Sequence, residues 1–275
     1  MAARAIRLIG LDLDGTLFND DKIIPSHTLH ILQQAMEQGV TVLPATGRPA
    51  TGLPDSLMAL RGLRYALTSN GARVTDLLTG QVIVDFSIPA QLAVQILEVL
   101  FRYDCLPSLF SGGSRVCPQG DVERIPDFLE SNMVAYVQST SKPVPDMAAY
   151  VRQMGSVEKI NAFFRDPDQR RQCWQELEAL PQGPAVTSSL ALNMEINAPG
   201  VDKGRGLLAL ARHLGLDRSQ VMACGDSGND LAMIRAAGLG VAMGNAQPAI
   251  LEAADYVTLT NQQEGVAAAV EKFVL

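Results

Sequence analysis

The chain has 275 residues, of which 47% are hydrophobic and 19% charged, and its formal net charge is −7. This composition excludes a largely disordered chain and allows one large domain or two modest ones. No basic run stands out, so we expect no nucleic-acid partner, and no apolar run reaches the roughly 18 residues that a membrane span requires.

The first apolar run, 6–13, begins almost at the start of the chain, and no signal peptide precedes it. The cysteines form no Cys-x-x-Cys pair, which favours incidental thiols in a reducing compartment. Together these features predict a soluble cytoplasmic protein.

Residues 1–82 alternate apolar strands with helices. Strands are predicted over 6–13, 40–43 and 65–68, and helices over 25–38 and 50–60. This alternation is typical of a parallel α/β sheet with right-handed crossovers. Polar residues follow each strand, and the carboxyl ends of the strands form the active edge of such a sheet.

The rhythm changes in the middle of the chain. A hairpin over 72–77 and 81–86 leads into a block of mixed helices and strands, in which 118–145 carries no clear pattern. Helices are predicted over 89–101 and 167–179, and strands over 106–110, 114–117 and 157–164. An antiparallel pair of strands is predicted over 185–189 and 192–197. This block is long enough to form a domain of its own. We expect an α/β core of residues 1–82 plus 193–275, and an inserted α+β domain of residues 83–192.

The α/β rhythm returns after Pro199. Asp202 is a plausible N-cap of a helix that carries Lys203 in its first turn and ends at Gly215. Further strands are predicted over 221–224, 239–242 and 256–259, with helices ending near 237 and beginning at 248 and 264.

Two carboxylates stand where the first strand ends. Because a strand alternates its faces, Asp12 and Asp14 are expected to point the same way. Neighbouring like charges beside an apolar strand are costly unless a cation lies beside them. Oxygen ligands suit Mg²⁺, so the pair predicts a magnesium site.

Three further polar clusters complete the predicted site. A parallel sheet would bring the clusters at strand ends together, and a helix start would point Lys203 over the same edge. The clusters are Thr46-Gly47-Arg48, Lys203, and Asp226 with Asn229 and Asp230.

The pattern resembles the haloacid dehalogenase superfamily of phosphohydrolases, and in particular its Cof-type branch. The resemblance covers the outer segments, roughly 1–82 and 193–275. It is carried by Asp12-Leu13-Asp14-Gly15-Thr16, Thr46-Gly47-Arg48-Pro49, Ser69-Asn70-Gly71-Ala72, Glu195-Ile196, Gly200-Val201-Asp202-Lys203-Gly204 and Gly225-Asp226-Ser227-Gly228-Asn229-Asp230. It implies a Rossmann-like parallel-sheet core with an inserted α+β cap that selects the substrate.

The resemblance also implies catalytic roles. Asp12 would be the nucleophile that forms an aspartyl-phosphate, and Asp14 the general acid and base. Thr46 and Lys203 would complete the catalytic set by holding the phosphoryl group.

Binding roles follow from the same resemblance. Mg²⁺ would be held by the Asp12 carboxylate, the Asp14 backbone carbonyl and Asp226, with Asp230 next to them to orient metal-bound water and Lys203. The implied phosphate- and substrate-binding residues are Thr46, Gly47, Arg48, Lys203 and Asn229. Arg48 has a competing interpretation as a structural residue that faces the cap.

The implied activity is Mg²⁺-dependent hydrolysis of phosphomonoesters of small metabolites, sugar phosphates first, by a monomer or homodimer. A phosphomutase or phosphotransferase would use the same motifs, and a non-catalytic phosphosugar-binding protein is the alternative from another class. The cationic residues Arg115, Lys142, Lys159 and Arg165 are candidates to meet a second anionic group, although their placement does not follow from the sequence.

Overall fold

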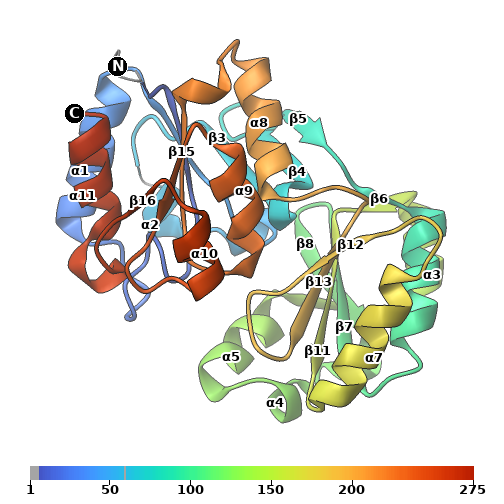
Figure 1. Cartoon of the computed structure of the whole chain (residues 1–275). Helices are drawn as coiled ribbons and strands as arrows, with labels where there is room; N and C mark the ends of the chain where they lie inside the picture. Colours follow the sequence, from blue (N-terminus) through green and yellow to red (C-terminus); the bar gives the residue numbers. More distant parts are fainter. Residues whose placement is uncertain (1–5, 59) are drawn as a thin grey trace. The chain divides into compact units, whose positions relative to one another are not determined.

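The computed structural model describes residues 6–58 and 60–275, which divide into two compact units (Figure 1). The first unit comprises residues 6–47, 53–85 and 202–275, and the second comprises 48–52 and 86–201. Among the described residues, no helix combines the length and apolarity of a membrane span.

A five-stranded parallel sheet forms the centre of the first unit, in the order β16-β15-β14-β1-β2. Its strands are β1 (Leu8–Leu11), β2 (Thr41–Pro44), β14 (Val221–Gly225), β15 (Leu239–Ala242) and β16 (Tyr256–Val257). Every residue of β1 and β14 is buried, as expected of central parallel strands covered on both faces. The pairing of β1 with β14 brings residues from distant parts of the chain to one edge of the sheet.

Helices cover this sheet (Figure 1). They are α1 (Ser26–Glu37), α2 (Asp55–Met58), α8 (Lys203–His213), α9 (Leu231–Ala236), α10 (Pro248–Ala253) and α11 (Gly265–Phe273). Asp202 caps α8 by accepting a hydrogen bond from the Arg205 backbone, as predicted.

The helix predicted over 50–60 is wrong. The structure has a 3₁₀ turn over Ala50–Gly52 and the single-turn helix α2. Pro54 lies between them, and proline disfavours a helical conformation in the residue before it.

The predicted hairpin is confirmed, but the third predicted strand does not extend the parallel ladder. β3 (Tyr65–Thr68) pairs antiparallel with β4 (Arg73–Asp76), which pairs with β5 (Val82–Asp85). A single bridge between Ala45 and Leu67 connects β3 to the end of β2.

The second unit is built on a six-stranded sheet, in the order β12-β13-β11-β7-β8-β9. Its strands are β7 (Cys105–Ser111), β8 (Ser114–Pro118), β9 (Ser141–Val144), β11 (Lys159–Phe164), β12 (Ala185–Thr187) and β13 (Asn193–Asn197), with a separate pair of β6 (Ile88–Pro89) and β10 (Ser156–Val157). β13 pairs with β11 and β12, although the domain boundary expected at 193 assigns it to the core. The pairing of β12 with β13 confirms the antiparallel pair predicted over 185–189 and 192–197, whereas the pairing of β13 with β11 is not readable from sequence.

Helices flank both faces of this second sheet (Figure 1). They are α3 (Ala90–Leu100), α4 (Ile125–Phe128), α5 (Ser131–Thr140), α6 (Met147–Met154) and α7 (Pro167–Glu178). A small core of Leu106, Ile125, Val137 and Phe163 joins α4 and α5 to one sheet face. The stretch 118–145, which carries no clear sequence pattern, forms α4, α5 and β9.

Candidate active site

Three carboxylates gather at the carboxyl ends of β1 and β14. Asp12 directly follows β1 and Asp226 directly follows β14, and Asp230 returns to them through the 3₁₀ turn Gly228–Asp230. One carboxylate oxygen from each lies within 4.8 Å of the others. The parallel pairing of β1 with β14 therefore builds this cluster from residues more than 200 positions apart.

Lys203 connects two of these carboxylates. Its Nζ donates to Asp12 Oδ1 and to Asp230 Oδ1, each at 2.6 Å, and all three side chains are buried. Burial by itself lowers the pKa of Lys203, but attraction to Asp12 and Asp230 outweighs it and raises the pKa above its ordinary value. The side chain is therefore a fixed cation beside Asp12.

Burial and mutual repulsion make the carboxylates reluctant to ionise together. Burial first, and then the charge of Asp230, raise the pKa of Asp12, while Lys203 opposes the shift. The same two causes raise the pKa of Asp226 to about 6, and a hydrogen bond from Thr16 opposes them. A cation among these oxygens would favour the ionised form of each.

The three carboxylates fit a hard divalent cation such as Mg²⁺, which prefers oxygen ligands. Asp230 already accepts hydrogen bonds at both oxygens, from Lys203 at Oδ1 and from the backbone of Asp226 and Ser227 at Oδ2. This arrangement fits a role in orienting Lys203 and the loop more than a direct metal contact.

Gly15 makes room for the cluster. Its φ of +85° favours glycine, and a Cβ there would lie 2.5 Å from Asp226 Oδ2. Thr16 holds the same carboxylate by donating to Oδ1 at 2.9 Å. The glycine and threonine of the Asp-x-Asp-Gly-Thr motif therefore position Asp226, the aspartate that follows the neighbouring strand.

Asp14 has different surroundings from Asp12. Because β1 ends at Leu11, the alternation of a strand does not extend to Asp14. Its side chain is 43% exposed and pairs with Lys22 at 2.9 Å, whereas Asp12 is buried against Lys203. The Asp14 charge also contributes to the raised pKa of Asp226, so it lies near the acidic cluster.

Thr46 and Asn229 are connected through Asn70. The buried Thr46 follows β2, its N–H donates to Leu67, and its carbonyl accepts from the Asn70 N–H. The Asn229 side chain donates to Asn70 Oδ1 at 3.2 Å. The turn after β3 thus connects the Thr46 loop to the loop that carries Asp226 and Asp230.

Gly47 and Arg48 fall on opposite sides of the division between the units. Gly47 belongs to the first unit and Arg48 to the second. The Arg48 guanidinium donates to the Gly52 carbonyl at 3.2 Å and lies 5.4 Å from the centre of the Tyr136 ring. These contacts fit the structural interpretation of Arg48, and its phosphate contact stays a prediction.

Three supporting residues are absent from the site predicted by sequence. Thr16 donates to Asp226, Lys22 pairs with Asp14, and the Asn245 side chain donates to the Gly15 carbonyl at 2.8 Å. Thr16 stands inside a quoted motif and could have been found there. Lys22 and Asn245 have no motif or spacing to mark them.

The fold and this acidic, lysine-bound cluster are those of a phosphohydrolase. The chain belongs to the haloacid dehalogenase-like hydrolase family, whose model matches residues 9–270. It is an enzyme of the phosphatase type within that family. The predicted resemblance and the predicted α/β fold class are confirmed.

Relatives of known name match along nearly the whole chain. The 5-amino-6-(5-phospho-D-ribitylamino)uracil phosphatase YcsE of Bacillus subtilis is 30% identical, over 98% of this chain and 96% of its own. The HMP-PP phosphatase of Escherichia coli O6:H1 is 31% identical, over 88% of this chain and 85% of its own.

Solved structures agree with the fold. A haloacid dehalogenase-like hydrolase from Bacteroides thetaiotaomicron superposes with a TM-score of 0.82 at 30% identity, covering 97% of this chain and 99% of that one. A haloacid dehalogenase-like hydrolase from B. subtilis has a TM-score of 0.84 at 28% identity, covering 98% and 100%.

Proposed function

We propose that this chain is a Mg²⁺-dependent phosphatase that hydrolyses phosphomonoesters of small metabolites through an aspartyl-phosphate at Asp12. Sugar phosphates are the substrates that we favour. The observation that carries the proposal is the Asp12 carboxylate, held at 2.6 Å by Lys203 beside Asp226. The names of the relatives, a phosphoribitylaminouracil phosphatase and an HMP-PP phosphatase, support small phosphorylated metabolites as the substrate class.

In the first step, a carboxylate oxygen of Asp12 attacks phosphorus, and the bond from phosphorus to the leaving oxygen breaks. Lys203 favours the ionised, nucleophilic form of Asp12. The leaving oxygen takes a proton from Asp14, so that an alcohol departs instead of an alkoxide.

In the second step, water attacks the phosphorus of the aspartyl-phosphate. Asp14, now ionised, accepts the water's proton, and the bond between phosphorus and Asp12 breaks. Asp14 pairs with Lys22 at 2.9 Å, and its side chain is 43% exposed, so water can reach it. Inorganic phosphate leaves and the Asp12 carboxylate is restored.

The carboxylates of Asp12 and Asp226 and the Asp14 backbone carbonyl would hold Mg²⁺. When bound, the metal neutralises phosphoryl charge and brings the phosphate to its nucleophile. Asp230 and Asn229 orient their neighbours through their hydrogen bonds to Lys203 and Asn70. Thr46, Gly47 and Lys203 hold the phosphoryl oxygens in this proposal.

The test is phosphate release from a panel of phosphorylated metabolites, with Mg²⁺ and with a chelator. Asp12→Asn keeps the side-chain shape and removes the nucleophilic charge, so turnover should fall by at least about 10³-fold. Asp55→Asn, an exposed substitution in α2, is the matched control. Chelator-insensitive turnover, or turnover that survives Asp12→Asn, would contradict the proposal.

A further inference from the structure

Two cations flank one phenylalanine ring in the second unit. Phe110 on β7 pairs across the sheet with Arg115 on β8 and with Lys159 on β11. The Arg115 guanidinium lies 4.9 Å and the Lys159 ammonium 4.6 Å from the centre of the Phe110 ring. We call these three residues, with Glu195 and Tyr136, the Phe110 cluster.

Among the residues that the structure describes, only one of the two cations forms an ion pair with a carboxylate. Lys159 pairs with Glu195 at 3.3 Å, and both side chains are buried. Arg115 is only 7% exposed, and its one hydrogen bond goes to the Ser108 hydroxyl at 3.2 Å. Within the described residues, its Nε has no hydrogen-bond partner and its guanidinium forms no ion pair with a carboxylate.

A second unused donor lies close to Arg115. The Tyr136 hydroxyl on α5 is buried and has no hydrogen-bond partner in the part of the chain that the structure describes. The next residue of α5, Val137, lines the same small cavity as Arg115, which places this turn of the helix beside the guanidinium. Burial lowers the pKa of that guanidinium, and the influences of Tyr136, Cys117 and Glu195 oppose this only in part. Glu195 itself already forms the ion pair described above. Two donors of the cluster thus lack an acceptor.

A buried cation without a counter-ion is costly, and a neutral aromatic ring offsets only part of that cost. A guanidinium presents its donors in a planar fork that matches carboxylate and phosphate oxygens. The group that would satisfy Arg115 is therefore an oxyanion, and a phenol beside it can donate to the same group.

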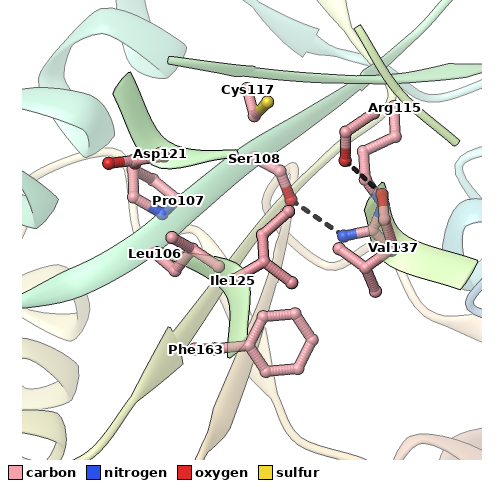
Figure 2. A pocket seen from close by; sticks show the side chains of 10 residues that line it. Leu106, Pro107, Ser108, Arg115, Cys117, Asp121, Ile125, Val137 and Phe163 are labelled. Atoms are coloured by element: carbon pink, nitrogen blue, oxygen red, sulfur yellow. Dashed lines mark hydrogen bonds between the residues drawn. The ribbon is translucent and has the colours of Figure 1, made fainter. Parts of the chain in front are cut away.

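The cavity beside Arg115 is too small to be the binding site. It measures about 10 Å³, and its polar lining includes Ser108, Arg115, Ser141 and Asp121 (Figure 2). The Asp121 carboxylate is already paired with Arg124 at 2.9 Å. A space of that size holds about one water molecule. Arg115 as a whole residue is 7% exposed, so the ligand must approach it from the surface and not from this cavity.

We propose that Arg115, assisted by Tyr136, binds an oxyanion, either a phosphate or a carboxylate group. One source is a second anionic group on the substrate. This alternative rests on the proposed function, and it predicts that the substrates are phosphate esters that carry a further phosphate or a carboxylate. The other source is a separate anionic ligand. The two sources share the same chemistry and are distinguished by experiment.

The first experiment tests the site without any catalysis. Thermal unfolding of the full chain is followed as sodium sulfate replaces sodium chloride at constant ionic strength. Arg115→Met keeps the side-chain length and removes a charge without a counter-ion, so it should fold. Arg171→Met is the matched control, because Arg171 is an exposed arginine of α7 paired with Asp168. Sulfate should raise the Tm of the wild type and the control more than that of Arg115→Met.

The second experiment identifies the source of the oxyanion. Steady-state kinetics compare glucose 6-phosphate with fructose 1,6-bisphosphate and 6-phosphogluconate. If the substrate supplies the oxyanion, Arg115→Met raises KM for the two doubly anionic compounds by about 10- to 100-fold, as expected for a lost charged hydrogen bond. The KM for glucose 6-phosphate and kcat for all three should change by less than about threefold.

The outcomes of the two experiments distinguish the source of the oxyanion and test the Arg115 site separately from the proposed function. A sulfate response that depends on Arg115, with equal kinetic effects on every compound, supports the site and assigns it to a separate ligand. Equal sulfate responses in the wild type and Arg115→Met, together with unselective kinetics, would overturn the site. If no compound releases phosphate, the proposed function fails while the sulfate experiment still decides the site.

Discussion

At the scale of single residues, the site separates two similar aspartates by their surroundings. Asp12 is buried against a lysine, and Asp14 is half-exposed beside Lys22. Lys203 opposes the rise in the pKa of Asp12 and so favours its nucleophilic, ionised form. The half-exposed Asp14 is instead accessible to a leaving group and to water, as a general acid and base must be. Exposure and partners therefore favour the roles that the motif order implies.

Replacing Asp14 by Asn should slow catalysis without unfolding the protein. Because general acid–base catalysis contributes roughly 10²- to 10⁴-fold, kcat should fall by about that factor. The loss should be smaller for p-nitrophenyl phosphate, whose leaving group needs little protonation. Asp21→Asn, an exposed change in the same loop, is the control. An equal loss on all substrates would argue against the acid role of Asp14.

The raised pKa of Asp226 predicts how stability depends on pH. The folded protein holds a proton on Asp226 up to about pH 6, whereas an unfolded chain releases it near the ordinary aspartate pKa of 3.8. Between these values the folded state binds more protons, so the contribution of Asp226 to stability falls as pH rises. Asp12, whose pKa is also raised, acts in the same direction.

Under the proposed function, Mg²⁺ should offset this loss, because a metal ion at this site would bind the ionised carboxylates. The increase in Tm on adding Mg²⁺ should therefore grow as pH rises through about 4 to 6. Thermal unfolding with and without Mg²⁺ across this range is the measurement. Asp226→Asn should remove most of the pH-dependent increase. An increase that is the same at every pH would contradict the assignment.

At the scale of elements, a short turn holds the site together. Ser69, Asn70 and Gly71 all have positive φ, at 53°, 56° and 90°. Asn70 contacts the Thr46 loop on one side and Asn229 on the other. Gly71 packs against the start of α8, where an added Cβ would lie 2.1 Å from the Asp202 carbonyl oxygen. The turn therefore sets the position of α8, and with it Lys203.

Gly71→Ala should damage both stability and activity. Gly80 is the matched control, since it has a similar φ of +71° but open space around the added Cβ. Gly80→Ala should cost about 1–2 kcal/mol for the backbone conformation alone. Gly71→Ala should cost at least about 1–3 kcal/mol more because of the clash, and kcat should fall as α8 shifts. Urea unfolding and phosphate release measure both, and equal effects in the two variants would refute this role.

At the scale of the whole molecule, the two units are assembled differently along the chain. The first sheet needs β1 and β2 from one end of the chain and β14, β15 and β16 from the other. The second sheet takes all its strands from 105–197, within the uninterrupted stretch Phe86–Val201. Only Arg48–Gly52 joins that unit from elsewhere.

This difference predicts how fragments fold. Residues 86–201 should fold alone, with dispersed amide resonances and cooperative urea unfolding, because every strand has its partners. Residues 1–85 lack β14 and should not form the parallel sheet, since β1 would lose one of its two neighbours. An unfolded 86–201 fragment would show that the second unit depends on the first.

The class of fold, most elements and the residues of the acidic site are predictable from the amino-acid sequence alone. These features are local, because apolar periodicity, helix caps and short motifs are readable where they stand. Asp12, Asp226 and Lys203 can be grouped by sequence reasoning, since parallel strands share a carboxyl edge and a helix start can reach it.

Contacts between distant parts of the chain follow from the tertiary structure and from nothing local. The pairing of β13 with β11 and the hydrogen bond from Thr16 to Asp226 join residues that lie far apart along the chain. The lack of an ion pair at Arg115 among the described residues likewise follows from the tertiary structure alone. It results from which side chains the sheet and α5 place around it, and no local pattern in the sequence records that environment.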